Sequence, residues 1–340
     1  MQLLKRKAPE RNPDRACLTG IRWRACLITT LCALWVSLSS CAFLPQGTGR
    51  AQEKSAAESP SDLTLHYEMA GSGKPILLLH GLGANTHSWR YIVGALAASY
   101  HVIALDLKGF GASPKPPDTA YSVYDQAALV RQFILEQDLH NLTLIGHSFG
   151  GLVALVTTLS FDPSQRSRLS RLVLISSVAS EQREPPFFRI LVTPVLGPLV
   201  LKLVPTEWVV EYILKRAYHD DTKIADDTVA LYAAPLDSPE AHHALLQTAR
   251  QLRRLDANAL ASHYRHLELP VLIVWGQQDE IVPLEVGYGL HSAIPNSELV
   301  IIPHSGHIPI EEHPHETGAA ILDFLNKGEP DLVIKSERDR

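Results

Sequence analysis

The feature that most constrains the fold is the alternation, from about residue 62 onward, of short apolar segments with segments of helical pattern. Several apolar segments contain hardly any polar residue, which is typical of parallel strands that are covered on both faces of a sheet. Strands that alternate with helices predict an α/β protein with a mostly parallel sheet and right-handed crossovers. The expected strands are 63–69, 75–81, 101–107, 141–147, 171–177, 271–276 and 298–303.

Three helices are expected among and after these strands, and two of them have recognisable starts. Ser122 and Asp125 have the spacing of a capping box, with aspartate in place of the usual glutamate, and predict a helix that continues to about residue 137. A second helix is expected to follow Pro283, and a third to run over residues 311–325.

Residues 181–268 interrupt the alternation with prolines, apolar helical stretches and no clear strand. We expect a helical cap here, inserted between two parts of one core at 61–180 and 269–328, with a polar tail at 329–340. The run 185–205 is strongly apolar, but its two basic residues and its prolines argue against a transmembrane span. We predict that it forms a lid helix packed on the core rather than a membrane-docking helix, and that it gives an apolar wall to any site beneath.

The N-terminal region differs in composition from the rest of the chain. A basic stretch is followed by the apolar run 25–42, which has the length of a signal peptide and ends in small residues. We expect a signal peptide at 1–40 and a flexible polar tether at 41–60. No cysteine follows residue 41, so neither a disulfide nor a cysteine-bound metal can hold the later residues together. The four cysteines are Cys17, Cys26, Cys32 and Cys41.

Cys41 has two interpretations. The segment 38–41, LSSC, resembles a bacterial lipobox, in which the cysteine is lipidated and becomes the new N-terminus, although Ser40 stands where glycine or alanine is commoner. The alternatives are ordinary cleavage near Ala42, giving a secreted or periplasmic protein, or an uncleaved membrane anchor. We favour an exported, membrane-anchored lipoprotein. Alanine rather than aspartate after the cysteine favours the outer membrane, by analogy with Gram-negative lipoproteins, and the domain would otherwise lie on the periplasmic face.

The stretch GHSFGG, residues 146–151, places a serine between glycines, after an apolar strand and before a helical segment. Gly-x-Ser-x-Gly at a strand-to-helix turn is a nucleophile elbow. Ser148 would have a strained backbone with its hydroxyl exposed, while Gly146 and Gly150 lack the side chains that would collide there. Gly151 would let the helix pack closely, and the helix start would direct N–H groups toward the reacting centre.

A serine hydroxyl needs a base, and the base needs an orienting partner. Asp279 follows an apolar strand and His307 follows the last strand, so both are expected at the carboxyl edge of the sheet with Ser148. Asp279 next to Glu280 could instead be a solvated loop pair. The four histidines between residues 304 and 315 could suggest a metal site, but loop histidines so close together are more often solvated.

On these residues the chain resembles the α/β-hydrolase fold family, and within it the capped carboxylesterases. The resemblance covers about residues 62–327 and implies a mostly parallel sheet of about eight strands, flanked by helices, with a helical cap before the strand that bears the acid. The motifs that carry it are HGLG (80–83), DLKGFGAS (106–113), GHSFGG (146–151), GQQDEIVP (276–283) and GHIPIEEHP (306–314).

The resemblance also assigns roles. It implies that Ser148, Asp279 and His307 form a catalytic triad in the order nucleophile, acid, base. The backbone N–H groups of Leu82 and Phe149 would form the oxyanion hole. We expect His80, in HGLG, and Asp106, in DLKGFGAS, to be structural.

The function that the resemblance implies is hydrolysis of carboxylic esters (EC 3.1.1) with small to medium apolar acyl groups, through an acyl-enzyme and without metal or organic cofactor. One alternative is a carbon–carbon bond hydrolase or cofactor-free peroxidase with the same triad. Another is a non-catalytic, lipid-anchored binding protein. Serine at the elbow argues against dehalogenases and epoxide hydrolases, which use aspartate there. The formal net charge of −5 gives no basic footprint for nucleic acid. We therefore expect a small-molecule ester and a membrane as partners, and the sequence predicts no oligomeric state.

Overall fold

A computed structural model describes residues 63–162 and 164–327, all within the unit Pro60–Arg340. The expected signal peptide, Cys41, the whole tether at 41–60 and the polar tail at 329–340 lie outside the described residues. The predictions about export and lipidation therefore stay predictions.

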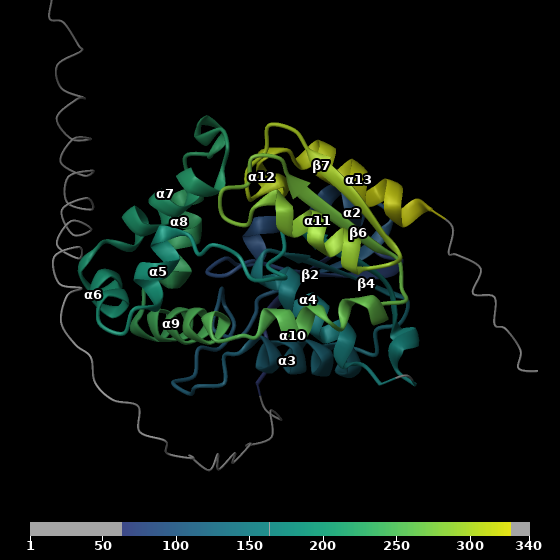
Figure 1. Ribbon diagram of the computed structural model, residues 1–340, viewed down its shortest axis with the longest axis horizontal. Helices are drawn as coiled ribbons and strands as arrows, with labels where there is room; N and C mark the ends of the chain where they lie inside the picture. Colours follow the sequence, from purple (N-terminus) through teal and green to yellow (C-terminus); the bar gives the residue numbers. More distant parts are fainter. Residues whose placement is uncertain (1–62, 163, 328–340) are drawn as a thin grey trace, which may run out of the picture. The chain divides into compact units, whose positions relative to one another are not determined.

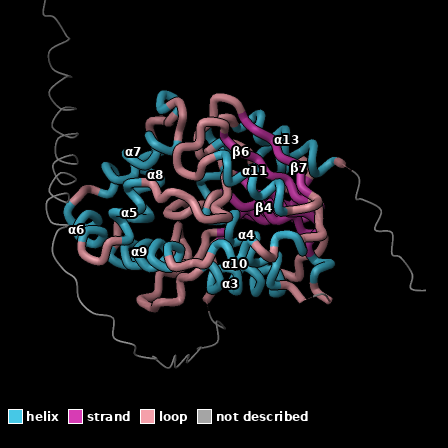
Figure 2. The backbone as a smooth tube through the Cα atoms, in the orientation of Figure 1, coloured by secondary structure: helices cyan, strands magenta, loops and turns pink. Residues whose placement is uncertain are grey.

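The described residues form a seven-stranded sheet in the order β1-β3-β2-β4-β5-β6-β7 (Figures 1 and 2). All neighbouring strands are parallel except β1, which is antiparallel to β3. The expectation of a mostly parallel sheet is confirmed, with seven strands in the described part against about eight expected. The first expected strand, 63–69, contributes only the short β1. The strands are β1 (Tyr67–Ala70), β2 (Lys74–Leu79), β3 (Tyr100–Leu105), β4 (Leu142–His147), β5 (Leu169–Ile175), β6 (Val271–Gly276) and β7 (Ser297–Ile302).

Helices cover the sheet and bury its central strands completely. Every residue of β4 and of β6 is buried, which explains why both strands contain few polar residues. Helices α3 and α4 pack on each other, and α4 also contacts β2, β4 and β5. Helices α2 and α13 likewise contact each other. These helices are α2 (Val93–Ala97), α3 (Val123–Glu136), α4 (Phe149–Ser160), α11 (Leu284–Ala293), α12 (Pro309–Glu312) and α13 (Pro314–Asn326).

Two of the expected helix starts are confirmed and one helix is corrected. Ser122 Oγ accepts from the backbone N–H of Asp125 at 3.1 Å, and the Asp125 carboxylate accepts from the N–H of Ser122 at 2.8 Å, so the capping box of α3 is present. Helix α11 begins directly after Pro283. The prediction of a single helix over 311–325 is wrong. The chain forms two helices there, α12 and α13, with a break before Pro314. Proline lacks the N–H that would continue the first helix.

Between β5 and β6 the chain forms helices and no strand. We call residues 181–268 the helical segment. Figure 1 shows α5 to α9 gathered on one side of the sheet, with α6 at the edge farthest from β6 and β7. Its helices are α5 (Pro186–Val192), α6 (Leu196–Leu203), α7 (Thr206–Ala217), α8 (Thr228–Ala233), α9 (Pro239–Arg253) and α10 (Ala257–Ala261).

Among the described helices, none is by itself both long enough and apolar enough to cross a membrane. The pair α5 and α6 meets those two criteria when it is taken together, but its helices are bent by 102° relative to each other. The apolar run 185–205 is therefore a bent helical pair, and no straight helix runs through it.

Candidate active site

Ser148 lies at the turn between β4 and α4 in a backbone conformation that residues with a side chain rarely adopt. Its φ is +54° and its ψ is −119°. A Cβ added at Gly146 would lie 2.3 Å from the carbonyl oxygen of Gly150, and one at Gly150 would lie 2.2 Å from that of Leu79. Glycine is therefore required on both sides of the serine, because strand and helix approach each other too closely for any side chain.

Three loops at the carboxyl edge of the sheet bring Ser148, Asp279 and His307 together. His307 Nε2 lies 2.8 Å from Ser148 Oγ, and His307 Nδ1 lies 2.8 Å from Asp279 Oδ2. Because Asp279 can only accept in its ionised form, Nδ1 carries the proton of the neutral imidazole and Nε2 is free to accept from the serine hydroxyl. All three residues are buried.

The acid is itself held in one orientation. Asp279 Oδ1 accepts from the backbone N–H groups of Ile281 and Val282, both at 2.9 Å, and this leaves Oδ2 for the imidazole. The acid loop and the base loop also touch, since a Cβ at Gly276 would lie 1.8 Å from the carbonyl oxygen of Gly306. The distance between acid and base therefore depends on this close backbone approach.

The backbone of His307 is fixed from two sides. Its N–H donates to the carbonyl of Ala217, the last residue of α7, at 2.6 Å, and its carbonyl accepts from His147 Nε2 at 2.8 Å. The preceding N–H, of Gly306, donates to the Glu312 carboxylate at 2.6 Å. The same carboxylate accepts from the N–H of Asp220, so one buried side chain ties the base loop to the helical segment.

His147 is a site residue that the sequence analysis missed. Burial above all, and then the neighbouring His307, lowers the pKa of His147 to about 3, so it stays neutral and its Nε2–H serves as a donor. Its sequence signal was its place in GHSFGG, directly before the serine.

The oxyanion hole expected from Leu82 and Phe149 stays a prediction, but the HGLG loop that carries Leu82 lies beside the serine. A Cβ at Gly81 would lie 3.2 Å from the Ser148 Cβ, so the HGLG loop lies against the serine. Within residues 63–162 and 164–327, no acceptor is found for the backbone N–H of Leu82 or of Phe149. The first of these precedes Gly83 in the loop, and the second begins α4, where helix N–H groups have no partner in the helix.

His80 and Asp106 make structural contacts. His80 is fully buried and donates from Nδ1 to the carbonyl of Gly81 at 2.8 Å, while its Nε2 accepts from the N–H of Leu107 at 3.0 Å. Burial lowers the pKa of His80, although the nearby Asp106 opposes that shift. The Asp106 carboxylate accepts from the N–H of Thr86 and from a second backbone N–H in its own loop, both at 2.8 Å. These bonds join the loops that follow β2 and β3.

A buried carboxylate beside the site was also missed. Glu311 accepts from Arg90 Nη2 at 2.7 Å, from the Tyr218 hydroxyl at 2.8 Å and from the Tyr232 hydroxyl. Burial first, and then the Glu311 charge, raise the pKa of both tyrosines, so both remain protonated donors. Both lie in the helical segment, whereas Arg90 and Glu311 lie in the core. The adjacent acidic pair in GHIPIEEHP was the available sequence signal, but its partners are distant in sequence.

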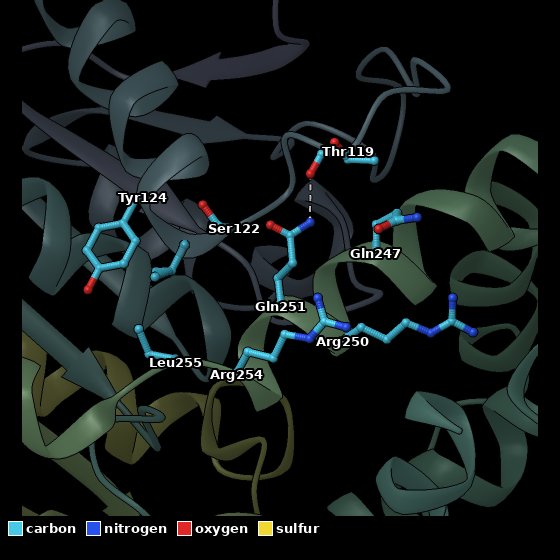
Figure 3. A pocket seen from close by; sticks show the side chains of 9 residues that line it. Thr119, Ser122, Tyr124, Gln247, Arg250, Gln251, Arg254 and Leu255 are labelled. Carbon is cyan, nitrogen blue, oxygen red and sulfur yellow. Dashed lines mark hydrogen bonds between the residues drawn. The ribbon is translucent and has the colours of Figure 1, made fainter. Parts of the chain in front are cut away.

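Two other features of the described residues are separate from this site. No group of three or more histidine, cysteine, aspartate or glutamate residues is arranged to hold a metal ion in the part of the chain that the structure describes. A hollow of about 570 Å³ lies between the start of α3 and helix α9, where Gln251 donates to the carbonyl of Thr119 (Figure 3). None of the triad residues lines it.

Comparison with known proteins agrees with this arrangement. The model of the Alpha/beta hydrolase family matches residues 76–320. A 2-hydroxy-6-oxo-6-(2'-aminophenyl)hexa-2,4-dienoic acid hydrolase of Metapseudomonas resinovorans is 30% identical over 270 residues, which are 77% of this chain and 87% of that protein.

Two solved structures give a similar result. An alpha/beta hydrolase fold protein from Burkholderia ambifaria is 27% identical with a TM-score of 0.68, and the match covers 76% of this chain and 93% of that one. A thermophilic esterase from Thermogutta terrifontis is 25% identical with a TM-score of 0.66, and the match covers 81% and 97%. The sequence predicts a resemblance to carboxylesterases in particular. These similarities do not single out carboxylesterases within the family.

Proposed function

The chain belongs to the alpha/beta hydrolase family, and from that premise we propose that it is a serine hydrolase that cleaves carboxylic esters with small to medium apolar acyl groups. The observation that carries the proposal is the chain of hydrogen bonds from Ser148 through His307 to Asp279, each 2.8 Å long.

In the proposed reaction, His307 Nε2 takes the hydroxyl proton of Ser148 while the serine oxygen attacks the ester carbonyl. Asp279 stabilises the imidazolium. The N–H groups of Leu82 and Phe149 bind the developing oxyanion, and each is worth about 2.7–4 kcal/mol in the transition state. The tetrahedral intermediate then collapses. The alcohol leaves with the proton from His307, and an acyl-serine remains. Water, activated by the same imidazole, then releases the acid.

Two leucines of the helical segment support an apolar acyl group. A Cβ at Gly83 would lie 3.7 Å from Leu236 Cδ1 and 3.8 Å from Leu245 Cδ1. Both side chains therefore lie against the loop that we assign to the oxyanion hole. An alkyl chain bound there would be in contact with hydrocarbon, which favours apolar acyl groups by about 0.8 kcal/mol for each buried methylene.

Two basic side chains of the core already have partners, which supports a neutral substrate. Lys108, which follows β3 at the carboxyl edge of the sheet, donates from Nζ to Asp118 at 2.8 Å. Arg90 donates to Glu311 at 2.7 Å. A substrate carboxylate that loses its water needs a cation in exchange, and neither of these side chains is free to supply one.

A carbon–carbon bond hydrolase is the second candidate, and the relative that is named a 6-oxo-dienoic acid hydrolase favours it. Hydrolysis of such a ketone breaks a carbon–carbon bond, and the same triad could support it. That substrate carries a carboxylate, which the pairing of the basic side chains disfavours here.

The test combines labelling with two substrate series. We expect a fluorophosphonate probe to label the wild-type chain but not Ser148→Ala. The control is Ser160→Ala, which should still be labelled and which changes an exposed serine at the end of α4, the helix that follows Ser148. Turnover of p-nitrophenyl esters should vary with acyl length and vanish in Ser148→Ala. Labelling without ester turnover, but with cleavage of a 2-hydroxy-6-oxo-dienoate, would establish the second candidate. No labelling of the wild type would establish a non-catalytic binding protein.

We further propose that the chain is exported and lipidated at Cys41, on the strength of the basic stretch, the apolar run and the LSSC segment. Two hydrophobic chains or more are needed for stable membrane attachment, which a diacylglyceryl group and an N-acyl chain would supply. Fractionation of cells that express the full chain or Cys41→Ser, with mass analysis of the mature N-terminus, tests this. Identical fractionation and an unmodified cysteine would contradict it.

A further inference from the structure

Helix α6 exposes apolar side chains on the face that points away from the rest of the helical segment. Val195, Leu199 and Leu203 are exposed by 72%, 43% and 67%, and their spacing of four residues places them on one side of the helix. We call these three residues the outer face of α6. On the other side, Gly197 and Leu201 are buried.

This pattern is unusual for a helix at a water-facing surface. Such a helix normally carries charged or polar residues on its outer side, and a helix that is apolar all round is normally buried. Here the only charged residue of α6 is Lys202. Leaving apolar side chains in water forgoes about 25 cal/mol for each Å² that could be buried. The outer face of α6 is therefore a surface that lacks its apolar contact.

The surroundings of this face suggest which contact is missing. Figure 1 places α6 at the edge of the helical segment farthest from β6 and β7, so that it projects from the core. The exposed Arg189 and Lys202 lie directly before and after the uncharged stretch 190–201. Trp208, which is 40% exposed, follows shortly after it. Apolar residues that are flanked by basic side chains and tryptophan are typical of helices that lie in the interface of an anionic bilayer.

The N-terminal part of the sequence supports the same partner. The apolar run 25–42 precedes a polar stretch of about 20 residues before the first described residue, Leu63. A flexible chain of that length has a root-mean-square span of roughly 25 Å. An attachment at Cys41 would hold the domain near a bilayer at a high effective concentration, at which a weak second contact becomes occupied.

We propose that the outer face of α6 inserts shallowly into the headgroup region of a phospholipid bilayer. The inserted side chains gain apolar contact, while Lys202 and Arg189 reach the phosphate groups. The inference rests on the proposed membrane attachment but not on the ester chemistry. The sequence favours a lid helix packed on the core over a membrane-docking helix. In the structure α6 packs on α5 and α9 of the helical segment, and the proposal assigns membrane docking to its outer face.

The test uses the full chain in vesicles of phosphatidylethanolamine and phosphatidylglycerol that carry a photoactivatable lipid. Trypsin would release α6 in the peptides 190–202 and 203–215, because Arg189, Lys202 and Lys215 are cleavage sites. We expect lipid adducts to concentrate on these two peptides. Leu199→Glu with Leu203→Glu should reduce the adducts on them at least about fivefold, because both side chains are those that would leave water.

The matched control is Tyr288→Glu, which changes an aromatic residue of the core helix α11 whose exposure of 51% lies between those of Leu199 and Leu203, and which should leave the adducts unchanged. Hydrolysis of a water-soluble ester, measured in parallel, should be the same in all variants, which separates failure of this inference from failure of the proposed activity. Adducts spread evenly over the exposed surface, or unchanged in the glutamate variant, would overturn the proposal. No lipid adducts on these peptides, together with self-association of the full chain that the glutamate variant loses, would overturn the proposal and replace the bilayer by a second copy of the chain.

Discussion

The buried pair of Arg90 and Glu311 gives the sharpest test of how the helical segment is held on the core. Replacing Arg90 by methionine keeps most of the side-chain volume but leaves the Glu311 carboxylate with two phenol donors and no cation. Removing one partner of a buried ion pair costs about 3–5 kcal/mol. The Arg90 side chain is 17% exposed, so water partly replaces it, and we expect a loss of about 3 kcal/mol in the free energy of unfolding.

Glu311→Gln should cost about 1.5–3 kcal/mol, because the amide still accepts one hydrogen bond but the charge is gone. The double variant lacks both charges and should be less destabilised than the sum of the singles by about 1–3 kcal/mol. Equilibrium urea unfolding, followed by intrinsic tryptophan fluorescence, to which the buried Trp89 and Trp275 contribute, measures all three. Arg168→Met is the control, because Arg168 pairs with the exposed Asp138 and its loss should leave the free energy of unfolding nearly unchanged. If the two single effects simply add, the two groups are not coupled and the reasoning fails.

Three further outcomes follow from the site. Ser148→Gly should abolish turnover yet raise the free energy of unfolding by about 1 kcal/mol, since it relieves a φ of +54°; a less stable variant would show that the turn is not strained. Gly146→Ala should lower that free energy by about 3 kcal/mol in the same urea assay, because its Cβ would lie 2.3 Å from a backbone oxygen, and an unchanged midpoint would contradict the packing. Burial lowers the pKa of His147 from 6.5 to about 3, so the unfolded chain takes up a proton that the folded chain does not. The free energy of unfolding should therefore fall as pH falls from about 6.5 toward 3, by up to about 1.36 kcal/mol for each pH unit. In His147→Asn it should fall less steeply. Equal slopes for the wild type and the variant would show that His147 does not have this lowered pKa.

The sequence predicted the elements whose cause is local. The elbow at Ser148 follows from glycine spacing between an apolar strand and a helix, and the capping box at Ser122 follows from two side chains three positions apart. Ser148, Asp279 and His307 each follow the end of a parallel strand, β4, β6 and β7, and this was sufficient to predict that they lie at one edge, because parallel strands share their carboxyl ends.

The contacts that the sequence could not predict are those between distant segments. Arg90 and Glu311 are 221 residues apart, and nothing in either neighbourhood marks the other as its partner. The tyrosines that complete the network lie in the helical segment, whose packing depends on the whole fold. Pro314, by contrast, was a visible helix breaker, and the break before α13 should have been predicted from it.

The bond from the His307 N–H to the Ala217 carbonyl limits how this protein can be re-engineered. Insertions over a catalytic core are attractive units to exchange between homologues, on the view that the core keeps its chemistry and the insert brings its selectivity. Here the insert supplies an acceptor to the backbone of the general base. A chimera that carries a foreign insert would retain Ser148 and Asp279 but would position its histidine only if the new chain offered a carbonyl at the same point. We therefore expect point changes at Leu236 and Leu245 to be a better way of altering selectivity than transplanting the insert.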